Sequence, residues 1–335
     1  MLSGPRAVQA AVLEVARQHY DARDYGSVVQ LLRDLPRAGF TELPELGFIM
    51  ADSARRVGGV DDVLELAIDV VAAARAAGDS RVLCDALNLQ GVLLLEHGHP
   101  QAAERAWCEL VVVASETDDP QYVARASNNL GISAILDMRL PDAINCLQRA
   151  CAAYIRLGYA RGLAQTNLNL GIVFREMDHE EESYAHFQRA LTWAYAADGM
   201  DDVARIEQEL ALLQVYLTKD LATAAENAQM ALQRFTSLGE PAGTADALKV
   251  IGVVAIANHD ADEAQAALDA AIGLAREMKL LALEGETLFA LAAVARLRHA
   301  YPDGYKLEQQ AQAIFREMGA EGWAEQVRKR MMSLV

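Results

Sequence analysis

A small residue recurs every 40 residues along most of this chain, and this spacing constrains the fold more than any other feature. Gly91, Gly131 and Gly171 are the clearest members, and the last two lie in the apolar segments NLGISAIL and NLGIVF. The remaining members, with one extra residue before Gly252 and a shorter first interval, are Ala16, Ala51, Ala211, Gly252 and Ala292. Self-similarity at such a period is typical of a repeat protein.

Each repeat is predicted to be a pair of helices. A second apolar segment, with contact residues such as Ala143 and Leu147, begins twelve or thirteen residues after each small residue. Turns such as RLGY and SLGE end the repeats, and Gly158, Gly239 and Gly319 are expected to take the left-handed conformation that ends a helix. The eight prolines fall before or between the predicted helices, where a missing N–H costs little.

Two segments resemble the tetratricopeptide repeat: NNLGISAILDMRLPDAINCLQRACAAY and LNLGIVFREMDHEEESYAHFQRALTWAY. Both have Leu-Gly in the first helix, and a small residue, an aromatic residue and a further Ala in the second. The lengthened 40-residue repeat is similar to that of kinesin light chains, the Leu-Gly-Asn polarity adaptors and bacterial peptide-sensing regulators. The resemblance covers nearly the whole chain and is strongest in its middle repeats. It implies an all-α, right-handed superhelical solenoid whose first helices line a concave groove.

We therefore predict a single tetratricopeptide solenoid over residues 1–335, because one helix pair cannot bury its apolar face without stacked neighbours. About seven helix pairs are expected, followed by a C-terminal capping helix over 320–335. The approximate boundaries, including the shorter first unit, are 6–39, 40–79, 80–119, 120–159, 160–199, 200–239, 240–279 and 280–319.

The charge balance argues against nucleic acid as a partner. The chain has 47 Asp and Glu against 30 Lys and Arg, a net charge of −17, whereas nucleic-acid binding needs a basic face. No apolar run approaches the roughly 18 residues of a membrane span, and the N-terminus lacks the apolar core of a signal peptide. We expect no membrane association and a cytoplasmic protein. Its four cysteines are expected to be small buried residues in a reducing compartment: Cys84, Cys108, Cys146 and Cys151.

No motif predicts catalysis. The sequence has no Gly-rich phosphate loop, no Gly-x-Ser-x-Gly elbow and no plausible nucleophile–histidine set. His97 and His99, like His179 and His186, lack a third metal ligand at a suitable spacing and are expected to be solvated histidines near turns. We therefore predict that the protein is not an enzyme, binds no metal and needs no cofactor.

Fixed offsets from the small residue predict which side chains face the groove. Side-chain amides offer both a donor and an acceptor to a peptide backbone, apolar residues offer contact, and arginines bind carboxylates. The predicted groove residues are Asn88, Arg125, Asn128, Asn129, Ile132, Ile135, Gln165, Asn169, Ile172, Arg175, Arg205, Gln208, Leu212 and Val215. The resemblance implies that Asn129 and Asn169 clamp a bound peptide backbone.

Two other uses of these residues stay open. An asparagine on a first helix can hydrogen-bond a neighbouring repeat and set the pitch of the solenoid. The arginines can pair with nearby acids, such as Glu176 and Glu209, in an ordinary solvated network.

The leading hypothesis is a non-enzymatic adaptor that captures a peptide or partner segment, with acidic residues or a free C-terminus, in its groove. A second hypothesis is a self-assembling scaffold, a homo-oligomer formed through the convex face or the C-terminal QVRKRMMSLV. A third is a signal-peptide receptor that regulates another protein.

Overall fold

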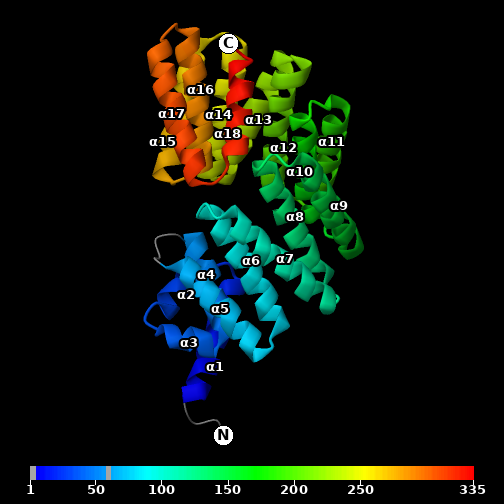
Figure 1. The fold of residues 1–335 in the computed structure, drawn as a ribbon, viewed down its shortest axis with the longest axis vertical. Helices are drawn as coiled ribbons and strands as arrows, with labels where there is room; N and C mark the ends of the chain where they lie inside the picture. The colour runs from blue at the N-terminus through cyan, green and yellow to red at the C-terminus, as the bar shows by residue number, and fades with distance from the viewer. Residues whose placement is uncertain (1–4, 58–61) are drawn as a thin grey trace. The chain divides into compact units, whose positions relative to one another are not determined.

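The computed structural model describes residues 5–57 and 62–335. This part of the chain contains eighteen α-helices and one π-helical turn and no β-strand, so the predicted all-α fold is confirmed (Figure 1). The chain divides into two compact parts, residues 1–126 and 127–335, called here the N-terminal body and the C-terminal body.

The N-terminal body is built from seven helices and the first turns of an eighth. They are α1 (Pro5–Asp21), α2 (Tyr25–Leu32), α3 (Arg37–Glu42), α4 (Pro44–Val57), α5 (Val63–Ala77), α6 (Ser80–Glu96), α7 (Pro100–Glu116) and α8 (Pro120–Leu136).

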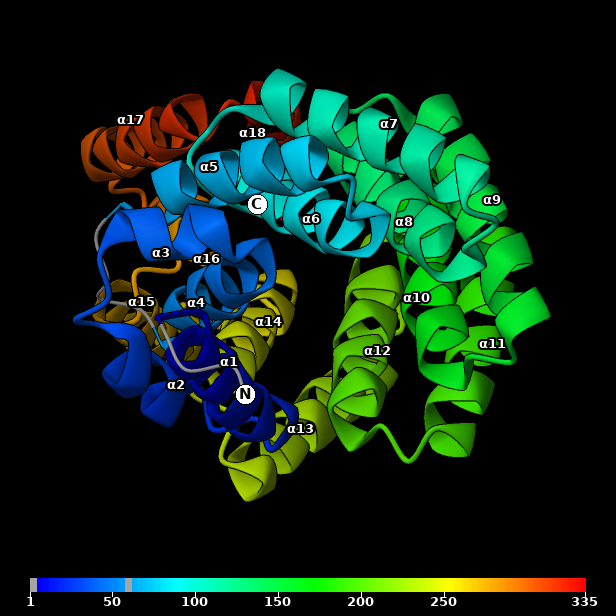
Figure 2. The ribbon, with the colours of Figure 1, turned by 90° about the horizontal axis from the view of Figure 1, so that it is seen from below.

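The C-terminal body contains the rest of α8 and the following elements. They are α9 (Leu140–Leu157), α10 (Ala160–Glu176), α11 (Glu180–Ala196), α12 (Met200–Leu213), the π-helix η1 (Gln214–Thr218), α13 (Leu221–Leu238), α14 (Pro241–Ala257), α15 (Ala261–Glu277), α16 (Leu281–Leu297), α17 (Tyr301–Glu317) and α18 (Glu321–Met332). Its first helices α10, α12, α14 and α16 contact one another in series, and α11 and α13 lie outside them (Figure 2).

Each recurring glycine packs against a large side chain sixteen positions later. A Cβ added at Gly171 would lie 2.4 Å from the ring of fully buried Phe187. One added at Gly91 would lie 2.3 Å from the indole of Trp107. The same relation joins Gly131 to Leu147 and Gly252 to Leu268. The two helices of a pair approach this closely only because the first helix has no side chain at the contact.

The turns between helices repeat every 20 residues. One residue in each turn has a positive φ, at every twentieth position from Gly78 to Asp198 and again from Lys219 to Gly319. The predicted left-handed positions at Gly158, Gly239 and Gly319 are confirmed, with φ of 61°, 66° and 64°. These short turns keep consecutive helices antiparallel and in contact.

The extra residue before Gly252 is accommodated inside a helix. The left-handed turn residue shifts by 21 positions, from Asp198 to Lys219, and the intervening α12 continues directly into η1. A π-helical turn takes one additional residue into a helix without breaking it. The turn carries Val215, which is fully buried, and Tyr216, which packs against the core of the C-terminal body.

Gly171→Ala should lower the stability of the folded chain by about 1–3 kcal/mol, because the new methyl group overlaps the fully buried Phe187 ring. Gly273→Ala, in α15 with no atom within 4 Å of the added Cβ, should instead stabilise by about 0.5–1 kcal/mol. Urea unfolding followed by circular dichroism measures both. Equal stability of the two variants would contradict the packing described here.

Candidate functional site

First helices line an open cavity in the N-terminal body. Its volume is about 870 Å³, and its lining residues come from α1, α4, α6 and the start of α8, including residue 119 just before it. Each of these helices is the first of a pair, which is the side on which the resemblance places the groove. The second helices α5 and α7 contribute no lining residue.

Five arginines and five carboxylates line this cavity, and several are paired. Arg17 donates from Nε to Glu45 at 2.8 Å, so α1 is tied to α4. The Asp52 carboxylate, 5% exposed, accepts hydrogen bonds from the Tyr20 hydroxyl and from Arg56 Nε, both at 2.7 Å. These contacts fix one side of the cavity and pair four of its ten charged side chains.

A second group of charges, around Asp85, is more loosely held. The hydroxyl of Tyr122 hydrogen-bonds the Asp85 carboxylate, and Arg125 Nη1 lies 3.9 Å from its Oδ1. Burial raises the pKa of Asp85 above its usual value, although Tyr122 and Arg125 oppose this. Arg81 is exposed and shares this one carboxylate with Arg125, because its charge also acts to lower the pKa of Asp85. Arg81 and Arg125 therefore have capacity to bind another anion.

Two of the predicted groove residues, Asn88 and Arg125, line the cavity. Asn88 is half-buried, and its backbone carbonyl accepts a 3.4 Å hydrogen bond from the Trp107 indole. Phe48 and Val92 add half-buried apolar surface beside them. Sequence reasoning gave no role to Arg81 or Tyr20, although the arginine stands ten residues before the small residue Gly91. Tyr20 lies in the shorter first unit, where the repeat signal is weak, and Arg81 lies at an offset from Gly91 for which the repeat pattern predicts no groove position.

In the C-terminal body, the predicted amide residues connect neighbouring first helices. Asn169 Nδ2 donates to Asn128 Oδ1 at 3.2 Å, and the Thr166 hydroxyl lies 3.3 Å from the same oxygen. The exposed Gln165 donates to Asp202 at 3.2 Å. Asn128 and Asn169 thus make the contact between repeats that the sequence left open as one use of these residues. Both stay partly exposed, as does Asn129.

The predicted apolar residues are covered to different degrees. Ile135, Leu212 and Val215 are buried in the core of the C-terminal body. Ile132 and Ile172 are half-buried. Gln208 is also buried, 2% exposed, with its amide 3.5 Å from a backbone carbonyl of α14. A groove that these positions line therefore has little open apolar surface.

Of the two predicted arginines in this body, Arg175 is buried and Arg205 is exposed. Arg175 is 3% exposed, pairs with Glu176 at 2.9 Å and also donates to Glu209. Although burial acts to lower its pKa, the two carboxylates raise the pKa of Arg175 above its usual value. The Arg175 charge is thus fully engaged inside the protein, and Arg205 is the one that faces solvent.

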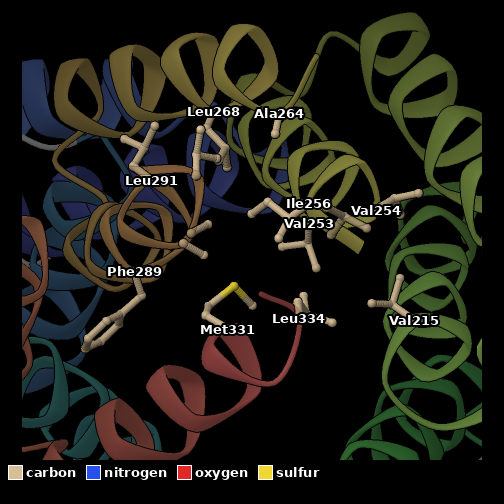
Figure 3. Close-up of a cluster of buried hydrophobic side chains, with 14 of the residues drawn as sticks. Val215, Val253, Val254, Ile256, Ala264, Leu268, Phe289, Leu291, Met331 and Leu334 are labelled. Atoms are coloured by element: carbon tan, nitrogen blue, oxygen red, sulfur yellow. The ribbon is translucent and has the colours of Figure 1, made fainter. Parts of the chain in front are cut away.

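Helix α18, in the segment predicted to form a capping helix, lies across the first helices of the C-terminal body. Trp323 Nε1 donates to Glu286 at 2.8 Å, and Gln326 Nε2 donates to Glu176 at 2.8 Å. Arg330 donates to Asp178 at 2.7 Å. Beyond these polar contacts, the buried side chain of Met331 belongs to the same core as Val215 and Val253 (Figure 3).

Two expectations from the sequence are wrong. His186 is not a solvated histidine, because its ring stacks on Phe174 with centroids 5.2 Å apart and its Nδ1 donates a hydrogen bond to Asn167 Oδ1 at 3.0 Å. Of the four cysteines only Cys84 is buried, and burial raises the pKa of its thiol to about 12. Cys108, on α7, is exposed, and Cys146 and Cys151 are half-buried.

Neither a metal cluster nor a membrane helix is found where the structure is described. Over residues 5–57 and 62–335, no three His, Cys, Asp or Glu side chains gather as metal ligands would. None of the helices in these ranges has the length and apolarity needed to cross a membrane.

No family model and no curated protein matches the chain. Among solved structures, a Rap protein complexed with competence and sporulation factor is similar over 98% of both chains, with 12% identity and a TM-score of 0.62. The Rap conjugation gene regulator of plasmid pLS20, in complex with the Phr* peptide, is similar over 97% of this chain and 94% of that one, with 14% identity and a TM-score of 0.59.

A third similar structure contains a tetratricopeptide repeat. A signal transduction ATPase with a tetratricopeptide repeat sensor, from Pyrococcus horikoshii, is similar over 98% of this chain, with 16% identity and a TM-score of 0.56. This chain spans about half of that protein, 52%. The fold is of the tetratricopeptide type. At these identities the likeness concerns the fold and not the ligand.

Arg175→Ala should destabilise the chain by about 3–5 kcal/mol, because Glu176 and Glu209 would lose their buried cation. Arg205→Ala removes an exposed arginine from the next first helix and should change stability by no more than about 0.5 kcal/mol. Urea unfolding of both variants tests the difference. A stable Arg175→Ala protein would show that this arginine is free to serve a ligand.

Proposed function

We propose that this chain is a non-enzymatic adaptor that binds a peptide segment in the cavity of the N-terminal body. The observation that carries the proposal is the open cavity of about 870 Å³ lined by first helices alone. A cavity of this size suits a short stretch of extended peptide or a few side chains.

The lining offers the contacts that a peptide needs. Asn88 places a side-chain amide, a group that can hydrogen-bond a peptide backbone, on the cavity wall. Phe48 and Val92 offer apolar contact to side chains. Arg81 and Arg125, on neighbouring first helices, are placed to bind a carboxylate through charge-assisted hydrogen bonds.

The net charge of the whole chain further restricts the class of peptide that we expect to bind. With a net charge of −17, the protein repels a strongly acidic peptide at long range. One carboxylate held between two arginines is compatible with that field, whereas a run of acidic residues is not. We therefore favour a peptide that ends in a free C-terminal carboxylate.

The solved neighbours support the ligand class. The two Rap proteins were solved with competence and sporulation factor and with the Phr* peptide. The partly exposed polar residues of the C-terminal body remain, within that body, predicted groove positions that can contact a ligand there: Asn128, Asn129, Gln165, Asn169 and Arg205.

Binding to a random octapeptide library tests this proposal. The library is prepared once with free C-terminal carboxylates and once with C-terminal amides, and peptides retained on the immobilised chain are identified by mass spectrometry. We expect enrichment from the carboxylate library and at least tenfold weaker retention by an Arg81→Ala/Arg125→Ala variant, since a hydrogen bond to a charged group contributes about 1.5–3 kcal/mol.

Arg105→Ala is the matched control, because Arg105 is an exposed arginine on α7 outside the cavity. It should retain the same peptides as the unmodified chain. Equal retention by the double variant, or no enrichment from either library, would rule out the cavity as the peptide site.

A further inference from the structure

Helix α18 packs against several earlier helices of the C-terminal body. It contacts α16 and α17 and reaches α10 through side chains about 150 positions earlier in the sequence. One face makes these contacts, with a spacing of three or four residues, as expected for an amphipathic helix. The contacting residues, and the one that follows the helix, are Trp323, Gln326, Val327, Arg330, Met331 and Leu334.

The surface beneath α18 carries an excess of negative charge. Each of its carboxylates contacts either α18 or one of the cations Arg175 and Lys249. These carboxylates are Glu176, Asp178, Glu209, Asp246 and Glu286. The same surface carries two cations, Arg175 and Lys249, so its five carboxylates are in excess. We call these seven residues, with the apolar Leu212, Val215 and Val253, the acidic surface.

The π-helical turn adds an aromatic ring to this surface. The Arg330 guanidinium of α18 lies 5.3 Å from the ring centroid of Tyr216, and that of Arg175 lies 6.0 Å from it. A cation above an aromatic ring is attracted by the ring's negative face. Tyr216 and Asp178 thus form, with Glu176, a binding place for one arginine of a docked helix.

The fit between α18 and the acidic surface is incomplete. A cavity of about 40 Å³ remains between them, lined by Tyr216, Lys249, Trp323 and Arg330 among others. The Nε of Arg330 is buried without a hydrogen-bond partner in the described structure and lies 3.6 Å from Glu176 Oε2. A buried donor left unpaired is unfavourable, so a helix whose arginine pairs fully at this place would bind the surface with a more favourable free energy.

The attachment of α18 also permits local release. A short turn connects α17 to α18, and the outer face of α18 is polar, with Glu321, Glu325 and Lys329 exposed. Its departure would leave every helix pair of the repeat intact. An element of this kind can open without global unfolding.

We propose that α18 is an exchangeable occupant of the acidic surface, and that this surface binds a basic amphipathic helix of a partner protein when α18 moves aside. The contact face of α18 predicts the pattern of a partner helix that fits this surface. It has an aromatic residue, an apolar residue four positions after it, an arginine seven positions after it and an apolar residue eight positions after it. This proposal does not depend on the ligand of the N-terminal cavity.

A labelled synthetic peptide of residues 320–335 tests the exchange on the full chain. The double variant Met331→Asp/Leu334→Asp of the full chain places two charges where α18 packs against the core of the C-terminal body, and it should displace α18. We expect this variant to bind the peptide at least tenfold more tightly than the unmodified chain, in which α18 occupies the surface. Unchanged binding by a variant of unchanged helical circular dichroism would overturn the proposal.

The peptide itself supplies a matched pair of charge changes. Arg330→Glu in the peptide should weaken its binding at least tenfold, because that arginine faces Glu176, Asp178 and Tyr216. Lys329→Glu makes the same charge change on the exposed face and should have a much smaller effect. Equal losses from both would show that binding follows overall charge and not the acidic surface.

Amide hydrogen exchange of the unmodified chain keeps the proposal testable if the core variant fails to fold. The amides of α18 should exchange at least tenfold faster than those of α16 and α17, which pack as a pair. Exchange of α18 at the same rate as α16 and α17 would show that it is a permanent part of the core, and would overturn the proposal.

Discussion

The contact between a small residue on each first helix and a large side chain on the second organises the molecule. Where the first helix carries glycine, as at Gly91 and Gly171, the partner ring or indole occupies the space that a Cβ would need. This contact brings the helices of a pair together and orients the pair. It also leaves the opposite side of the first helix free, so both surfaces discussed here are built from first helices.

Local spacing explains what the sequence predicts well. Features that depend on residues of a single repeat can be read from the sequence. They include the interval between Gly171 and Phe187, the left-handed turns and the extra residue before Gly252. The burial of Arg175 cannot be read in this way, because it depends on Glu209 from the next repeat and on coverage by α18, which lies about 150 residues later. Side chains at groove positions can therefore be placed on a helix face from sequence, but their exposure cannot.

The two first-helix surfaces differ in the chemistry that they offer. The cavity of the N-terminal body has as many arginines as carboxylates, and Arg81 and Arg125 stand only loosely paired on its wall. The acidic surface of the C-terminal body has more carboxylates than cations and already holds an arginine-bearing helix. Under the two proposals made above, one type of repeat provides two surfaces, and charge directs a carboxylate-bearing peptide to one and a basic helix to the other.

Hydrogen exchange of the chain with and without a peptide selected from the carboxylate library tests the central claim most directly. The account predicts slower exchange in α4, α6 and the first turns of α8, which line the cavity, and no change in the second helices α5 and α7. Protection confined to α5 and α7, or to the C-terminal body, would contradict it. Such a result would mean that the peptide binds elsewhere and that the open cavity has another role.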